Sequence, residues 1–416
     1  MVADFLIHNT SEVLTCAGPA PRIGSRQADA VSIPKAAIAA HRGTIVFVGA
    51  EADWRHAGTL TGDAVVIDAE GGAVIPGFVD PHTHVVFAGD RRDELRRRLG
   101  GATYAEIAAE GGGIVGSVKA TRAASDEELA SATRYRLDEM LQCGTTTCEA
   151  KSGYALTTDG ELKMLRTIRT LAATHPMEIS PTFMGAHEVP IEYRHRRRDY
   201  VDLVVREMLP AVARDRSAES CDVFCETGVF TPEESREILE AGRAVGLSPR
   251  IHADEFGSSG GSVVAAEVGA RSADHLIFIE EASAAGLAAS GVVATLLPIA
   301  SFYLKLGRFA PARMLMASGV AVALATDVNP GAGYSPSMPF AMTLACFGMH
   351  LTFEEALVAA TINAATSLGR HDRVGSLEPG KQMDAVMVQG PAINLIRVGV
   401  ETIRAVIKRG RVVIGN

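Results

Sequence analysis

Histidines and one aspartate stand at the ends of short apolar segments along this chain of 416 residues. His82 and His84 follow the apolar run 73–79. His252 ends a second apolar run, and Asp327 ends a third. Residues two apart on an extended backbone point the same way, so the imidazoles of His82 and His84 can reach one ion. Imidazole and carboxylate ligands suit zinc or iron, so these residues predict a metal site with one position left for water.

Two further groups, and the aspartate itself, are candidates for moving protons. Glu255 lies three residues after His252 and can shuttle a proton between water and substrate if a dry pocket raises its pKa; the alternative is a charge at a helix start. His275 either ligates the metal or hydrogen-bonds the water or the substrate carbonyl, and both remain open. Asp327 can bind the ion and accept a proton from water. The turn 328–333 after it has backbone amides that could contact a substrate carboxylate.

Strand-like and helix-like segments alternate through the middle of the chain. These segments must position the candidate metal ligands and proton-transfer residues. Eight short apolar or β-branched runs predict strands, at residues 73–79, 145–150, 178–183, 222–226, 249–252, 272–275, 292–296 and 320–325. Ser125 with Glu128 predicts a capping box at the start of one intervening helix, and Thr231 followed by Pro232 opens another. Eight such units over about 260 residues match a (β/α)₈ TIM-like barrel, whose strand ends meet at one mouth. A doubly wound sheet is the alternative, but it would bring these residues together less readily.

The two ends of the chain have a different character. Short β-branched runs bounded by Gly and Asp occur at residues 42–49, 64–68, 384–388 and 405–414. We therefore predict one small β-sandwich domain formed by both chain ends, residues 1–72 and 374–416. The catalytic barrel would span residues 73–373 between them.

Charge and hydropathy argue against nucleic-acid and membrane partners. The formal net charge is −9, so no basic surplus is available to neutralise phosphates. The basic run 194–198 is isolated and predicts a solvated helix start. The uncharged stretch 282–304 is long enough to cross a membrane, but Gly, Ser and Pro interrupt it, so we expect a helix, a buried strand and a loop.

The cysteines and the N-terminus indicate a cytoplasmic protein. Six cysteines are scattered without the spacing of a disulfide framework or a metal finger, and Cys221 and Cys225 are expected to be buried thiols. The first residues lack a basic segment followed by a long apolar one, so no signal peptide is predicted. The apolar helix expected over 340–349 serves either an interface, as in a homodimer, or the core.

Together these residues resemble the amidohydrolase superfamily of metal-dependent hydrolases, over nearly the whole chain. The segments that carry the resemblance are 80–91, 111–114, 149–154, 183–190, 252–255, 325–331 and 375–388. The first and fourth of these occur across the superfamily, whereas the set is specific to a branch that hydrolyses the C–N bond of a cyclic amide. The resemblance implies one zinc or iron ion per subunit, held by His82, His84, His252 and Asp327. Lys151 is expected to be structural, because a bridging carbamylated lysine would stand elsewhere.

The resemblance also implies a set of positions that contact a small-molecule substrate. They are Arg91, Tyr104, Tyr154, His187, Glu255, Asn329, Gly331 and Ala332. Arg91 can fork onto a carboxylate, although its neighbour Arg92 could take that role. Position 332 is Ala, where the family commonly has a residue with a hydroxyl group. A backbone contact with the substrate remains possible at this position, but a side-chain hydrogen bond does not. Glu255 and His275 would move protons and steady the oxyanion.

Two other functions fit part of the same pattern. An aminohydrolase of a nucleobase or related heterocycle would share the histidines and Asp327, but Arg91, Tyr154 and His187 suit an anionic tail better than a neutral base. A non-catalytic barrel that had lost its metal is disfavoured by the intact ligand set.

Overall fold

The computed structural model describes residues 1–102, 106–107 and 110–415. Eight parallel strands form one sheet that curls into a barrel, with neighbours in chain order. These strands are β8 Phe78–Asp80, β9 Thr145–Lys151, β10 Glu178–Ala186, β11 Ser220–Cys225, β12 Ser248–Ala253, β13 Ser272–His275, β14 Val293–Leu296 and β15 Val322–Leu324. The predicted barrel is confirmed, and the sequential order excludes the doubly wound sheet.

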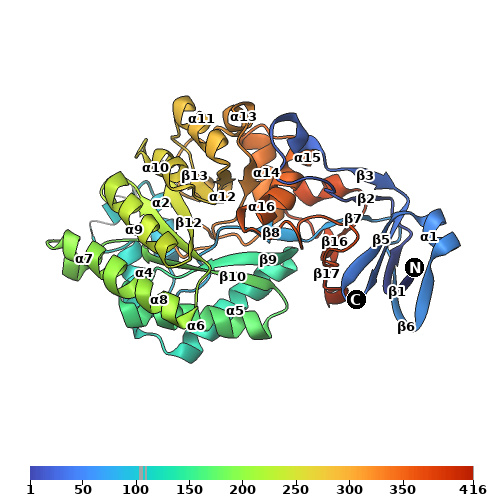
Figure 1. Ribbon diagram of the computed structural model, residues 1–416, viewed down its shortest axis with the longest axis horizontal. Helices are drawn as coiled ribbons and strands as arrows, with labels where there is room; N and C mark the ends of the chain where they lie inside the picture. Colours follow the sequence, from blue (N-terminus) through green and yellow to red (C-terminus); the bar gives the residue numbers. More distant parts are fainter. Residues whose placement is uncertain (103–105, 108–109, 416) are drawn as a thin grey trace.

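Helices cover the outside of the barrel (Figure 1). They are α2 Arg92–Leu99, α4 Ile114–Ala123, α5 Asp126–Gln142, α6 Thr158–Thr174, α7 Arg197–Leu203, α8 Leu209–Asp215, α9 Pro232–Ala244, α10 Gly261–Val268, α11 Glu281–Ser290, α12 Pro298–Tyr303, α13 Ala312–Ala317, α14 Met338–Gly348, α15 Phe353–Ala360 and α16 Ile362–Ser367. Short helical turns are η1 Gly24–Ala28, η2 Ile191–Tyr193, η3 Val204–Met208 and η4 Ala392–Ile396. The predicted capping box at Ser125 before α5 is confirmed, and the helix start predicted at Thr231 before α9 is confirmed and also forms a capping box, with Glu234.

The first and last barrel strands meet through hydrogen bonds just beyond their ends. The Asp327 backbone N–H donates to the carbonyl of His82 at 3.1 Å. One carboxylate oxygen of Asp80 accepts the backbone N–H of Thr326 at 3.1 Å, and the other accepts the Thr326 hydroxyl. Closure of the barrel therefore joins the two segments that carry the predicted metal ligands.

Both chain ends build a β-sandwich beside the barrel, where Figure 1 places the two termini. One sheet has the order β5-β4-β1-β6, and the other has the order β18-β17-β16-β7-β2-β3. The bounds are β1 Val2–His8, β2 Glu12–Leu14, β3 Ser32–Pro34, β4 Ala36–His41, β5 Thr44–Ala50, β6 Thr59–Asp68, β7 Ala73–Pro76, β16 Ala385–Val388, β17 Ile403–Lys408 and β18 Arg411–Ile414, with helix α1 Glu51–Ala57 alongside. Phe5 and Ile38 of the first sheet pack with Val74 and Ile407 of the second in one buried cluster. The predicted sandwich is confirmed.

The run 73–79, predicted as the first barrel strand, is two strands. Residues 73–76 form β7, which pairs with β16 and β2 in the sandwich, and only β8 belongs to the barrel. The chain turns at Gly77, where a Cβ atom would lie 2.4 Å from the Thr146 hydroxyl. Because every residue from 73 to 80 is buried, hydropathy does not reveal the break.

The stretch 282–304 lies in α11, β14 and α12, so its last part is a helix where a loop was expected. Pro298 occupies the first turn of that helix, a position where proline is favoured. Among the described residues, no helix combines the length and the apolar character that a bilayer span requires. Cys221 and Cys225 are buried in β11, as expected.

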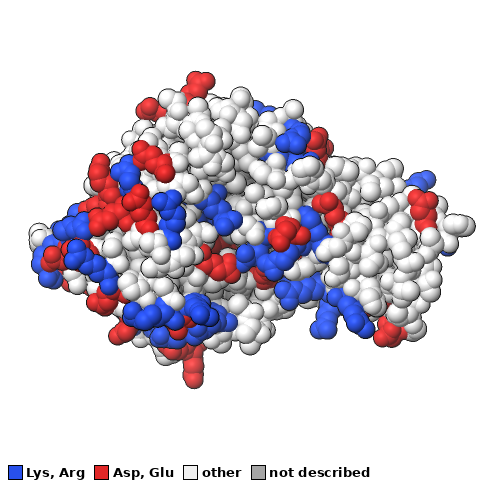
Figure 2. Space-filling model, in the orientation of Figure 1, with Lys and Arg blue, Asp and Glu red and all other residues white. Residues whose placement is uncertain are grey.

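The basic run 194–198 leads into helix α7, as expected of a helix start. Arg197 pairs with Glu234 at 2.7 Å, and Arg198 pairs with Glu237 at 2.6 Å. Figure 2 shows acidic and basic side chains intermixed over this end of the molecule.

Candidate active site

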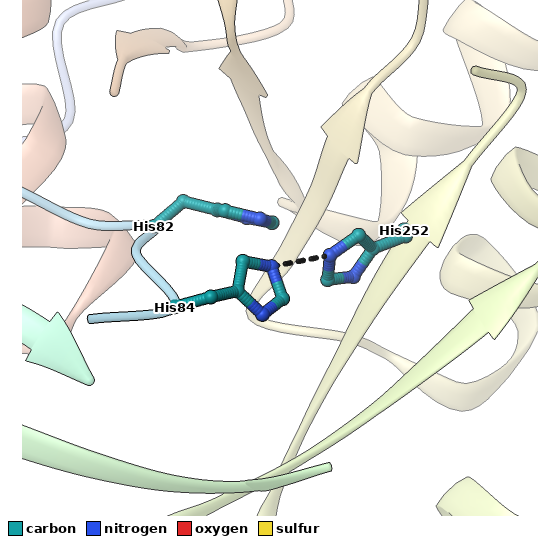
Figure 3. Close-up of side chains that lie close together, drawn as sticks. All are labelled: His82, His84 and His252. Atoms are coloured by element: carbon teal, nitrogen blue, oxygen red, sulfur yellow. Dashed lines mark hydrogen bonds between the residues drawn. The ribbon is translucent and has the colours of Figure 1, made fainter. Parts of the chain in front are cut away.

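Three imidazoles converge at the C-terminal mouth of the barrel. His82 and His84 lie on the segment that follows β8, and His252 lies near the end of β12 (Figure 3). One ring nitrogen of each residue lies within 4.8 Å of those of the other two. The Nε2 atoms of His84 and His252 are 3.2 Å apart. The predicted convergence of these three side chains is therefore confirmed, and all three are buried.

The aspartate that follows β15 faces the same point. Asp327 Oδ1 lies 3.6 Å from His82 Nε2 and 3.7 Å from His84 Nε2. Burial raises the pKa of Asp327 to about 7. His82 Nε2 is buried and makes no hydrogen bond within the described chain. Histidine nitrogens and a carboxylate oxygen thus converge on one point, and one of these nitrogens has no hydrogen-bond partner among the described residues. This arrangement fits a cation bound by both nitrogen and oxygen ligands.

Each of two histidines is oriented from behind by a buried carboxylate. His82 Nδ1 lies 2.6 Å from Asp274 Oδ2, and His252 Nδ1 lies 3.0 Å from Asp222 Oδ1. A carboxylate at Nδ1 holds the ring proton there and leaves the Nε2 lone pair for a metal. Burial alone would raise the pKa of Asp222, but Lys151 and His252 lower it well below its ordinary value. These carboxylates therefore orient two of the three rings in the way that a metal site requires.

Glu255 and His275 lie beside this cluster. Glu255 Oε1 is 3.7 Å from His275 Nδ1. Burial, with the neighbouring Asp327 and Glu226 carboxyls, raises the pKa of Glu255 well above its ordinary value, whereas burial lowers that of His275. Glu226 also accepts the backbone N–H of Glu255 at 3.1 Å, so it fixes the position of this residue. A carboxylate whose pKa is raised accepts a proton more readily and can return it later in a reaction.

Three residues at these strand ends have a strained backbone. Asp254, His275 and Asp327 have φ angles of 52°, 74° and 57°, in the left-handed region that non-glycine residues rarely adopt. Such conformations persist where the surrounding structure enforces them, often at functional sites. Here they turn the chain sharply at the barrel mouth.

The predicted substrate-side residues line one pocket with the metal-ligand candidates. Arg91, Tyr154 and His187 lie on three different loops and all border it. Arg91 Nε donates to Glu94 Oε2 at 2.8 Å. Burial lowers the pKa of His187 to about 3, so its ring is neutral, and its Nδ1–H donates to the carbonyl of Gly153 at 3.0 Å. Tyr104 lies outside the described residues.

The turn after Asp327 uses its amides internally. The Asn329 side-chain oxygen accepts the N–H groups of Gly331 and Ala332, each at 2.7 Å. Those two amides, expected from the sequence to contact a substrate carboxylate, are therefore engaged within the turn. A Cβ atom at Gly331 would lie 2.3 Å from Arg91 Nη1, so glycine there makes room for the guanidinium.

Several lining or orienting residues were missed from the sequence. Phe224 and Phe256 form an apolar wall of the pocket, and Asp222 and Glu226 orient His252 and Glu255. A signal for three of them exists: Asp222, Phe224 and Glu226 alternate along and just beyond one buried strand, so they face one side.

Comparison with known proteins identifies the family. The model of the Amidohydrolase family matches residues 73–413. Proteins named imidazolonepropionase are 51% identical in Symbiobacterium thermophilum, covering 99% of this chain and 97% of that one, and 47% identical in Geobacillus kaustophilus, covering 99% and 98%. This chain belongs to the imidazolonepropionase branch of the amidohydrolase family. The family and the three-histidine cluster together indicate a divalent metal site.

Solved structures agree with the fold. A zinc-bound adenosine deaminase from Xanthomonas campestris matches with a TM-score of 0.72 at 18% identity, covering 100% of this chain and 93% of that one. A triazine hydrolase variant matches with a TM-score of 0.75 at 19% identity, covering 99% and 95%. At this level of identity, the likeness concerns the barrel and sandwich alone.

Proposed function

We propose that this chain hydrolyses 4-imidazolone-5-propanoate to N-formimidoyl-L-glutamate, a ring-opening step of histidine degradation. The observation that carries the proposal is its identity, at 43–51% over nearly its full length, to relatives named imidazolonepropionase. The pocket supports it, because a buried arginine borders the same space as the three-histidine cluster. The proposed substrate has a carboxylate on its side chain, which needs a charged anchor, and a ring amide bond, which needs a hydrolytic centre.

The residues fit one zinc or iron ion. His82, His84, His252 and Asp327 would hold it. When bound, such an ion lowers the pKa of a water molecule and polarises a carbonyl. The carboxylates behind His82 and His252 fix the ring orientations that this site needs.

The remaining side chains supply orientation and proton transfer. Arg91 binds the propionate carboxylate, and Tyr154 and His187 pack beside the ring. Water adds its oxygen to the ring carbonyl carbon, and Glu255 receives the proton that the water loses. The C–N bond then breaks, and Glu255 returns the proton to the leaving nitrogen. His275 donates a hydrogen bond to the oxyanion during the attack.

A heterocycle aminohydrolase is the alternative, and the near-full-length relatives do not favour it. The two activities are separated by product. We expect the metal-loaded protein to open the imidazolone without releasing ammonia and to leave cytosine or adenine unchanged. Release of ammonia from a neutral base, with no ring opening of the imidazolone, would favour the aminohydrolase.

We also infer a cytoplasmic enzyme that forms a homodimer. The six cysteines are free thiols, as in a reducing compartment. Helix α14 buries Met338 and Met342 but leaves the neighbouring Phe347 75% exposed, which suits a contact between subunits. Sedimentation equilibrium of the full chain tests the assembly: a monomer at micromolar concentration would contradict it.

A further inference from the structure

A cluster of charged side chains lies inside the barrel against the histidine site. Its members come from four strands of the barrel: Glu149 and Lys151 of β9, Asp222 of β11, Arg250 of β12 and Asp274 of β13. Every one is at most 1% exposed. Three carboxylates therefore face two cations where water cannot compensate their charge, so each depends on its partners.

Lys151 connects the two carboxylates that orient the histidines. Its Nζ atom lies 2.5 Å from Asp222 Oδ2, and the other oxygen of Asp222 lies 3.0 Å from His252 Nδ1. The same Nζ atom lies 3.9 Å from Asp274 Oδ2, which itself is 2.6 Å from His82 Nδ1. One ammonium thus stands between two carboxylate–histidine pairs.

Arg250 secures the same arrangement from another side. Its Nε atom lies 3.0 Å from Glu149 Oε1, and Glu149 Oε2 lies 2.7 Å from Lys151 Nζ. Its Nη2 atom also donates to the carbonyl of Pro81 at 2.8 Å, directly before His82. The charged cluster therefore fixes both the imidazole of His82, through Asp274, and the backbone just before it, through Arg250.

We propose that Lys151 is a positioning residue that couples His82 to His252, so that the two imidazoles present their Nε2 atoms to the metal as one unit. This inference rests on the proposed metal site. Removing the ammonium leaves Asp222, Asp274 and Glu149 facing each other with only Arg250 between them. Mutual repulsion then displaces a carboxylate, and at least one histidine loses the acceptor that fixes its Nδ1 proton.

The test is zinc affinity, measured on metal-free protein by competition with a chelator of known affinity. We expect Lys151→Met to bind zinc roughly 10–100-fold more weakly than the natural chain, the usual effect of losing an orienting partner. Lys408→Met is the matched control: Lys408 is also buried, lies 2.7 Å from Asp384 and belongs to the sandwich sheet. It should lose folding stability but keep the natural zinc affinity.

A zinc affinity of Lys151→Met within twofold of that of Lys408→Met would overturn the proposal. If Lys151→Met does not fold, Asp222→Asn and Asp274→Asn provide the second route. With Lys151 present, the double variant should lose zinc affinity non-additively, because both carboxylates act through one lysine. Additive losses would overturn the coupling. If the folded natural chain binds no zinc, the proposed metal site itself is wrong. That result is distinct from a failure of the coupling through Lys151, in which the natural chain still binds zinc.

Discussion

Glu255 is the residue whose protonation matters most to the proposed reaction. Burial and the nearby Asp327 and Glu226 carboxyls raise its pKa, which makes the Glu255 carboxylate a stronger base toward the attacking water. Glu255→Gln keeps the shape of the side chain but cannot exchange a proton. We expect a loss of about 10²–10⁴-fold in kcat. The metal content of the variant, measured by elemental analysis, should match that of the natural chain, and near-normal turnover would remove Glu255 from the mechanism.

Arg91 is the proposed anchor of the substrate carboxylate. A hydrogen-bonded charge pair of this kind contributes about 1.5–3 kcal/mol, so Arg91→Ala should raise KM roughly 10–100-fold with a smaller change in kcat. Arg91→Lys retains the charge but not the fork, and should recover only part of the affinity. Steady-state kinetics decide this, and a loss confined to kcat would contradict the anchoring role.

Gly331 tests the same anchor without changing its charge. A Cβ atom there would lie 2.3 Å from Arg91 Nη1, so Gly331→Ala must displace the guanidinium. We expect KM to rise while the metal content is unchanged. Gly116→Ala is the control, because a Cβ atom at Gly116 in α4 meets nothing within 4 Å. Equal KM values for the two variants would show that the space at Gly331 is not used by Arg91.

At the scale of elements, the closure between β8 and β15 depends on Asp80. Burial raises its pKa from an ordinary value of 3.8 to about 7. A raised folded-state pKa gives stability that is complete below pH 3.8 and is lost as the pH rises to about 7. The loss is at most roughly 1.4 kcal/mol per pH unit in that window.

Asp80→Asn keeps acceptor and donor positions toward Thr326 but does not titrate. As the pH rises from 4 to 7, the free energy of unfolding of this variant should therefore increase relative to that of the natural chain. Urea denaturation of the metal-free proteins at several pH values measures the difference. A difference that does not change with pH would contradict the buried, proton-holding state of Asp80.

The elements themselves were predictable where local signals are strong. Ser125 and Thr231 cap their helices through bonds that the sequence pattern names directly. The split of residues 73–79 was not predictable, because both halves are buried and only the pairing partners differ. Those partners, β16 and β9, lie about 310 and 70 residues away along the chain, beyond what a local pattern reports.

At the scale of the whole molecule, the barrel explains why distant residues form one site. His82, His252 and Asp327 were predictable because each lies at or just after the end of a strand, and parallel strand ends share one mouth. Lys151 was expected to be structural, and Asp222 was not singled out, because its contacts depend on which strands are neighbours. A polar side chain within a buried strand gains its function only through such a partner.

The measurement that tests the central claim most directly is hydrolysis of 4-imidazolone-5-propanoate, generated in place by urocanase. Loss of its ultraviolet absorbance would be followed with and without a chelator, and the product identified by mass. We predict fast ring opening to N-formimidoyl-L-glutamate that the chelator abolishes and zinc or iron restores. If the folded, metal-loaded protein does not accelerate the decay of the substrate above its spontaneous rate, the proposed function is contradicted.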